Sequence, residues 1–302
     1  MKHLIIVNKN SASSSSKDEF IKSVKKAFSS LDYEIYETPA PKAVISYLKE
    51  YLTFHKDEVV RVYACGGDGI AHEVANGLFG FSNAELAIIP IGTGNDFVKY
   101  YGDKEKFLNL NNMINGSTHL IDLSKITGAT LVEPLYSINV INFGFDAVVG
   151  VVGNKYKDMN KKDPYGKALK VAMLKARFNK ITVSADGVKL NKKRLLLCSL
   201  AQGNYVGGKF KAAPKSKNDD GLIDICLVKC MSFAHLGMIM GKYTAGHHLD
   251  KPNRVFIYKQ AKEVSIDAPK EIDICVDGEM IKGQHFDVSI VPNAIKLVLP
   301  KE

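Results

Sequence analysis

The chain has 302 residues, 46% of them hydrophobic, which is enough for a sizeable core and predicts two domains. Its five cysteines are odd in number and include no C-x-x-C pair, so they indicate reduced thiols and exclude a disulfide framework or a zinc site of that spacing. The first apolar run is too short for a signal peptide, and none reaches the length of a transmembrane helix, so we expect a cytoplasmic protein.

The net charge of +9 is concentrated in residues 154–180, which contain nine basic and two acidic residues. Such a segment attracts an anionic bilayer, a nucleotide or nucleic acid. No base-reading motif accompanies it, so we expect no nucleic acid partner. The segment therefore predicts contact with an anionic membrane surface, with a solvated helix face as the alternative.

Strands and helices alternate along the first third of the chain. Strands are predicted at 4–7, 34–38, 59–65 and 84–91, and helices at 17–30, at 42–51 and from residue 70. This rhythm favours a parallel sheet with helices on both faces, which is a three-layer α/β domain.

The third strand is followed by the run Gly66-Gly67-Asp68-Gly69. Glycines let the backbone approach a ligand closely, and the helix that follows, predicted to start at Ile70, directs free N–H groups at an anion. A carboxylate fits beside phosphate only if Asp68 holds a cation, orients a donor or takes a proton, which indicates phosphoryl chemistry. The alternative is ordinary turn chemistry, with Asp68 capping the helix.

A second glycine loop, Gly92-Thr93-Gly94-Asn95-Asp96, follows the fourth strand. A short helix is predicted at 97–100, with Asn95 or Asp96 as its N-cap. Because the carboxyl ends of neighbouring parallel strands share one edge of the sheet, we expect the two loops to face one another. Together they favour a phosphate site more than either loop does alone.

After a polar stretch at 109–117, the sequence becomes rich in predicted strands. These lie at 119–123, 136–145, 181–185, 194–202, 222–229, 255–258, 261–267, 271–276 and 286–298, and helices are predicted only at 165–178 and 233–243. We therefore predict a boundary near Asp122, with an α/β domain over 1–122 and a β-rich domain over 123–302. Alternatively, the last strand returns to pack on the first domain.

Further motifs follow the two glycine loops in a characteristic order. They are Phe143-Gly144-Phe145-Asp146, Asp219-Asp220-Gly221-Leu222 and Asp277-Gly278-Glu279. With the loops, they resemble the diacylglycerol kinase catalytic family, which includes sphingosine and ceramide kinases and small bacterial lipid kinases. The resemblance extends over nearly the whole chain. It implies ATP and Mg²⁺ as cofactors, and an α/β nucleotide-binding domain and a β-sandwich domain that meet at the active cleft.

The resemblance also implies roles for individual residues. It places ATP against Asn8, Ser11, Thr38, Gly66, Gly67, Asp68, Gly69 and Thr93. It makes Glu279 the general base for the lipid hydroxyl, with Asp277 as its partner or substitute, and it gives Asp68 a water-mediated contact with Mg²⁺. For Asp277-Gly278 the alternative is a type I′ hairpin turn and nothing more. Which of the two carboxylates acts is left open.

A structural Mg²⁺ site is implied at Asp220, with the backbone carbonyls of Lys217 and Leu222 as further ligands. Oxygen ligands suit this ion. The alternative is an Asx turn between two strands, and the positive side chain of Lys217 would lie close to the proposed metal.

Two departures from the family pattern bear on activity. The first loop has Lys9, Asn10 and Ala12 around Ser11, where the family usually has a proline and a glycine. Ile70 follows the first glycine motif, where the family has threonine. Loss of one hydrogen bond to phosphate costs about 0.5–1.5 kcal/mol if water replaces it, which is compatible with a slow enzyme.

We therefore predict a cytoplasmic, peripherally membrane-associated lipid kinase that transfers the γ-phosphoryl group of ATP to a lipid hydroxyl, with diacylglycerol as the first candidate. Its expected partners are the lipid substrate and an anionic membrane surface, and a homodimer is left open. An NAD kinase-like enzyme is one alternative, although it calls for an Asn-Glu pair where this chain has Asn95-Asp96. A nucleotide- or lipid-binding regulatory protein with little turnover is another, motivated by Ile70.

Overall fold

The structure, a computed structural model, divides into two units. It describes residues 1–8, 14–92, 94–158, 164–176, 180–192, 194–251 and 254–301. Unit 1 comprises Met1–Leu123 and Pro292–Glu302, and unit 2 comprises Ser124–Val291. The strands β5 (Ser117–Gly128) and β14 (Glu279–Leu299) contribute residues to both units.

Unit 1 contains a parallel sheet in the order β14-β4-β3-β1-β2. Its first four strands along the chain are β1 (Lys2–Asn8), β2 (Tyr33–Thr38), β3 (Val60–Cys65) and β4 (Ala84–Ile89). Every residue of β3 and β4 is buried, as expected for central strands covered on both faces.

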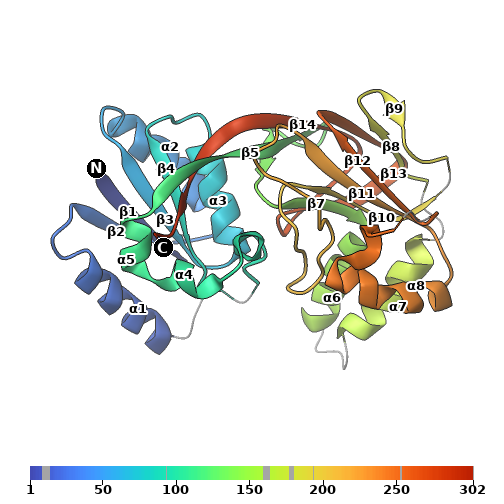
Figure 1. Ribbon diagram of the computed structural model, residues 1–302, viewed down its shortest axis with the longest axis horizontal. Helices are drawn as coiled ribbons and strands as arrows, with labels where there is room; N and C mark the ends of the chain where they lie inside the picture. The colour runs from blue at the N-terminus through green and yellow to red at the C-terminus, as the bar shows by residue number, and fades with distance from the viewer. Residues whose placement is uncertain are drawn as a thin grey trace. The chain divides into compact units, whose positions relative to one another are not determined.

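Helices cover both faces of this sheet, with α2 and α3 on one face and α1, α4 and α5 on the other (Figure 1). Their bounds are α1 (Ser14–Ala27), α2 (Ala43–Phe54), α3 (Asp68–Leu78), α4 (Lys104–Leu108) and α5 (Leu110–Ile114), and a 3₁₀ helix η1 spans Val98–Tyr101. The helices α2 and α3 pack closely because Gly77 leaves room for Leu48, whose side chain would lie 2.8 Å from an added Cβ. The predicted three-layer arrangement is confirmed.

Unit 2 is built on antiparallel strands in the order β12-β11-β10-β7-β13-β14, and β8 and β9 extend from β13. Their bounds are β6 (Leu135–Ser137), β7 (Val140–Gly144), β8 (Thr182–Ala185), β9 (Val188–Lys189), β10 (Leu195–Ala201), β11 (Ile223–Lys229), β12 (Phe256–Ala261) and β13 (Glu263–Val276). Fully buried side chains, including Phe143, Leu200, Ile225 and Phe286, form its core.

Three helices pack on unit 2: α6 (Phe145–Asp158), α7 (Pro164–Ala176) and α8 (Phe233–Ala245). Ala172 of α7 and Leu236 of α8 form a second apolar cluster with Leu196 of β10. All of β10 is buried because the strand core covers one face and this cluster covers the other. A second 3₁₀ helix, η2 (His247–Leu249), follows α8.

Several predictions of secondary structure were wrong. The predicted strand at 136–145 is divided into β6 and β7. Helix α6 was missed, because its valines favour strands locally, while packing of Phe145 in the second cluster favours the helix. The polar stretch contains α5, whose N-cap Asn109 accepts a hydrogen bond from the Asn112 N–H at 3.1 Å. The predicted strands at 261–267 and 271–276 form one strand, β13, with a register shift between Asp267 and Ile272.

None of the helices in the described part of the chain is long and apolar enough to cross a membrane. The basic segment falls mainly on α6 and α7. Lys161, Lys162 and Arg177 lie outside the described residues, whereas Lys170 and Lys175 are exposed on α7. Membrane contact by this segment stays a prediction.

Candidate active site

The carboxyl ends of the parallel strands bring several predicted nucleotide residues to one edge of unit 1. Asn8 pairs with Thr38 at the ends of β1 and β2, and Cys65 at the end of β3 pairs with Ile89 at the end of β4. Thr38 is buried, and the Asn8 Cβ lies 3.8 Å from the position of a Cβ added to Gly66. Ser11 and Thr93, which were also predicted to contact ATP, lie outside the described residues.

The two glycine loops contact each other directly through their backbones. The Gly92 N–H donates to the Gly66 carbonyl at 3.0 Å. A Cβ on Gly92 would lie 2.4 Å from the Gly67 Cα, so only glycine allows this approach. The expectation that the loops face one another is confirmed.

Asp68 joins the first loop to the second. Its Oδ1 accepts a hydrogen bond from the Phe97 N–H at 3.2 Å, and a Cβ on Gly94 would lie 2.5 Å from its Oδ2. The α3 helix starts at Asp68, after the N-cap Gly67, so the predicted start at Ile70 and the capping role of Asp68 were wrong. The N-cap has no side chain to occupy the first N–H groups of α3, which suit an anion.

The predicted N-cap role of Asn95 or Asp96 was also wrong. The short helix η1 follows Phe97 as its N-cap residue. The Asn95 amide instead folds back onto its own loop and donates to the carbonyls of Pro90 at 3.1 Å and Gly92 at 2.6 Å. Asp96 forms an ion pair with Lys99 at 2.7 Å. Asn95 therefore fixes the shape of the second loop.

Ile70 lies inside the fold, with only 3% of its surface exposed. Its Cγ2 atom would be 2.4 Å from a Cβ on Gly66, so this side chain occupies the space that Gly66 leaves. Ile70 therefore contributes to packing at the junction of β3 and α3. A threonine at position 70 would place its hydroxyl in this packed interior.

Asp277 and Gly278 form the predicted two-residue hairpin turn in unit 2. Their φ angles are 49° and 100°, and the flanking Val276 and Glu279 pair with each other. Positive φ at both central residues is the signature of a type I′ turn. The hairpin interpretation is confirmed, but it does not account for the whole role of Asp277.

The Asp277 carboxylate accepts four hydrogen bonds from one segment that lies far away in the sequence. Its Oδ1 accepts from the Ser137 hydroxyl at 2.7 Å and from the N–H groups of Asn139 at 3.1 Å and Val140 at 2.9 Å. Its Oδ2 accepts from the Ile138 N–H at 2.9 Å. These four hydrogen bonds hold the Asp277 carboxylate against residues 137–140.

Glu279 is half-buried at the first position of β14, directly after the turn. The Asp277 hydrogen bonds fix the turn that precedes it. The role of Glu279 as the proton acceptor, with Asp277 as its partner or substitute, stays a prediction. Sequence spacing could not separate these roles.

Asp146 is a carboxylate to which sequence reasoning gave no role. It lies in the first turn of α6. Burial raises its pKa to about 6, against the opposing effect of a hydrogen bond from Asn142. A carboxyl group with a pKa near neutrality is a candidate for proton transfer. The signal in the sequence was the position of Asp146 in Phe143-Gly144-Phe145-Asp146, one of the motifs that carry the family resemblance.

Asp220 forms the Asx turn that was the alternative to a metal site. Its Oδ1 accepts from the Leu222 N–H and its Oδ2 accepts from the Gln260 side chain, both at 3.1 Å. The Lys217 N–H points to the buried Asp224 instead, at 3.4 Å. No group of three or more His, Cys, Asp or Glu residues suited to a metal occurs within the described residues. The structural Mg²⁺ site stays a prediction.

Comparison with known proteins agrees with these features. Residues 2–126 match the model of the diacylglycerol kinase catalytic domain, and residues 139–299 match that of the YegS C-terminal NAD kinase beta sandwich-like domain. The chain is 29% identical to a diacylglycerol kinase of Bacillus subtilis, over 80% of this chain and 78% of that protein. It is 26% identical to a probable YegS-like lipid kinase of Pseudomonas aeruginosa, over 78% and 76% of the two chains.

Solved structures show the same fold. A diacylglycerol kinase from Bacillus anthracis matches with a TM-score of 0.70 at 21% identity, over 98% of this chain and 96% of that chain. An NAD kinase from Archaeoglobus fulgidus in complex with ATP matches with a TM-score of 0.52 at 12% identity, over 100% and 94% of the two chains. The matching family models and the named relatives place the chain in the lipid kinase class. The chain belongs to the diacylglycerol kinase catalytic family.

Proposed function

We propose that the protein transfers the γ-phosphoryl group of ATP to the hydroxyl of a lipid alcohol, with diacylglycerol as the first candidate. The observation that carries this proposal is the pair of glycine loops joined by Asp68 at the carboxyl edge of the unit 1 sheet. The two relatives described above are named as a diacylglycerol kinase and a probable lipid kinase, which supports a lipid as the acceptor of the phosphoryl group.

The residues at this edge fit a nucleoside triphosphate. The first N–H groups of α3 and the glycine backbone supply donors for phosphate oxygens without bulky side chains. Asp68 provides one carboxylate, and Mg²⁺ in phosphoryl-transfer sites is typically held by one or two carboxylates together with the phosphates. Asn8 and Thr38 would line the same site. Bound ATP and Mg²⁺ would supply the phosphoryl group and neutralise its developing charge.

Unit 2 would supply the group that takes the proton from the lipid hydroxyl. Glu279 is the first candidate, because Asp277 is occupied by its four hydrogen bonds. Asp277 would hold the turn and thereby position Glu279. Docking at an anionic bilayer would give the enzyme access to a substrate that resides there.

The test is transfer of radiolabelled γ-phosphate from ATP to a panel of lipid alcohols, with NAD as a control acceptor. We expect labelled lipid for at least one alcohol and none on NAD, and Asp68→Asn should reduce the rate by orders of magnitude while melting stays normal. Labelled NAD without labelled lipid would favour the NAD kinase-like alternative. Binding of nucleotide without transfer to any acceptor would favour the regulatory protein.

A further inference from the structure

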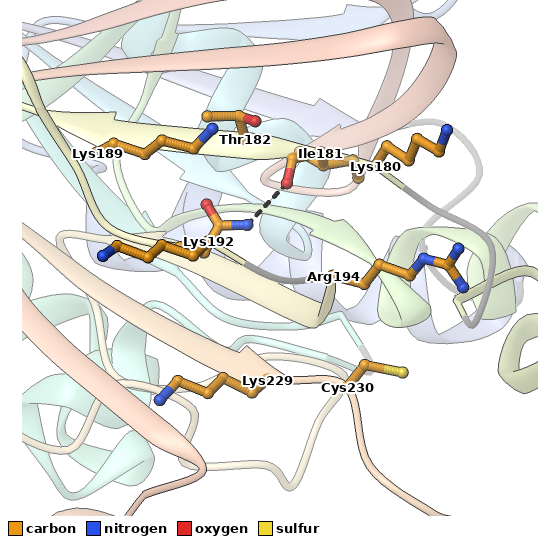
Figure 2. Close-up of a pocket in the computed structure, with 9 residues that line it drawn as sticks. Lys180, Ile181, Thr182, Lys189, Lys192, Arg194, Lys229 and Cys230 are labelled. Atoms are coloured by element: carbon orange, nitrogen blue, oxygen red, sulfur yellow. Dashed lines mark hydrogen bonds between the residues drawn. The ribbon is translucent and has the colours of Figure 1, made fainter.

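Unit 2 contains a pocket that none of the catalytic candidates enters. It is a cavity of about 640 Å³, lined by the start of β8, the end of β9, the start of β10 and the end of β11. Figure 2 shows its lining side chains. A cavity of this size falls in the range of small-molecule sites. We call it the basic pocket.

The lining of the basic pocket is strongly cationic. Five of its nine lining residues carry a positive charge and none is an acid; the charged ones are Lys180, Lys189, Lys192, Arg194 and Lys229. Arg194 directly precedes Leu195, which pairs with Lys229 on the neighbouring strand. Like charges on adjacent strands repel and destabilise the fold. A concave surface with one sign of charge also concentrates counter-ions.

Hydrogen bonds fix the walls of the pocket. Asn191 is 5% exposed, and its Nδ2 donates to the Ile181 carbonyl at 2.8 Å while its Oδ1 accepts from the Val183 N–H at 2.9 Å. On the other side, the Cys230 N–H donates to the Arg194 carbonyl at 3.1 Å. The backbone that carries the charged side chains is therefore held in place before any ligand arrives, which lowers the entropic cost of binding.

The charged groups surround the cavity and do not converge on one point. In Figure 2, Lys192 and Lys229 extend to one side, whereas Lys180 and Arg194 extend to the other. The Thr182 hydroxyl adds a neutral donor to the lining. Spread donors of this kind suit an anion with several oxygens or several separated charges. A guanidinium and ammonium groups together are typical of phosphate recognition.

We propose that the basic pocket binds a phosphate-bearing anion, either free phosphate or the phosphate of a phospholipid head group. The site is distinct from the glycine loops, which lie in unit 1, and from the Asp277 turn. Its existence does not depend on the proposed kinase activity, because it rests on charge and shape within unit 2. Where the ligand is a lipid head group, the pocket would retain the enzyme on membranes rich in anionic lipid.

Binding is measured without ATP or lipid substrate, so the result is independent of catalysis. The pocket variant combines Lys180→Gln, Lys189→Gln and Lys192→Gln, all at exposed positions. The matched control combines Lys259→Gln, Lys262→Gln and Lys270→Gln, which are also exposed in unit 2, lie outside the pocket lining and change the net charge equally. Thermal melting of each variant establishes that it is folded.

The probes are phosphatidylcholine vesicles with and without phosphatidylglycerol, measured by sedimentation, and inorganic phosphate, measured by calorimetry. We expect the pocket variant to lose up to about 100-fold in affinity for at least one phosphate-bearing probe, while the control changes by less than about threefold. Loss for anionic vesicles alone identifies the lipid head group as the ligand. Loss for inorganic phosphate as well identifies phosphate itself.

Three results would overturn the proposal. The first is an equal loss of affinity in the pocket variant and the control variant, which would show that binding depends on net charge alone. The second is an absence of binding, or no loss, for both probes. The third is a pocket variant that loses affinity for a short single-stranded RNA while vesicle and phosphate binding are unchanged, since that would make the pocket a nucleic-acid surface.

Discussion

Asp277 and Glu279 are separated by one residue, and the different tasks that we propose for them can be separated by two substitutions. In Asp277→Asn, the amide oxygen can keep the place of Oδ1 and its three donors. The amide nitrogen must then face the Ile138 N–H, which now donates at 2.9 Å to Oδ2. Asparagine tolerates the positive φ of 49° at this position, so backbone strain does not enter the comparison.

The expected cost of Asp277→Asn follows from these contacts. One buried donor is left unsatisfied, at about 1–3 kcal/mol, and the remaining hydrogen bonds lose their charge assistance. We expect the free energy of unfolding to fall by about 2–5 kcal/mol in total. Ser137→Ala removes one of the four donors and serves as the graded control, with a loss of about 1 kcal/mol.

Glu279→Gln should leave stability nearly unchanged and lower the rate of transfer. Glu279 is half-buried at a strand end, so its amide variant should change unfolding free energy by no more than about 1 kcal/mol. If it is the general base, lipid phosphorylation should fall by about 10²–10⁴-fold. Urea unfolding and the rate of labelled-phosphate transfer measure the two effects separately. An Asp277→Asn variant of normal stability that has lost all transfer would refute this division of roles.

Substitutions at four further positions test the site. Gly69→Ala places a methyl group in open space in the first turn of α3. The fold should be retained, while ATP affinity, measured by calorimetry, falls if phosphate occupies that space. Gly94→Ala places a Cβ 2.5 Å from the Asp68 Oδ2, which should displace this carboxylate and lower both transfer and stability. Asp146→Asn should gain about 2 kcal/mol of unfolding free energy over wild type between pH 4.5 and 7.5, because the raised pKa of about 6 favours the folded protein only while the carboxyl is protonated; a difference that is the same at both pH values contradicts this. Ile70→Thr should lower the unfolding free energy by about 1–3 kcal/mol through lost packing, and a transfer rate that rises with Ile70→Thr but not with Ile70→Val would show that the hydroxyl still reaches phosphate.

The nucleotide edge of unit 1 could be predicted because its information is local. Each strand is a short apolar run, and each glycine loop follows directly after one. Parallel pairing then forces the loops to one edge, which the contact between Gly66 and Gly92 confirms. The capping roles of Asp68, Asn95 and Asp96 were wrong because each side chain has a better partner within the loops.

The site in unit 2 depends on contacts that no local pattern contains. The donors to Asp277 lie 137 to 140 residues earlier in the chain, so the hairpin signal could not reveal them. The pKa of Asp146 depends on its burial in the first turn of α6, a helix that was not predicted from the sequence. The basic pocket also required the fold, which brings Lys229 at the end of β11 beside the cations of residues 180–194.

Two carboxylates of unit 2 have different surroundings. Asp277 accepts four hydrogen bonds from residues 137–140, whereas burial raises the pKa of Asp146 to about 6. Asn142, which hydrogen-bonds Asp146, pairs with Cys275 on β13, and the next residue of β13 pairs with Glu279. Side chains of consecutive strand residues point to opposite faces, so Asn142 and Glu279, which pair with Cys275 and Val276, lie on opposite faces of the sheet. Asp146 and Glu279 are therefore separate candidates, and the contrast between Asp146→Asn and Glu279→Gln in the rate of labelled-phosphate transfer shows which carboxylate the reaction needs.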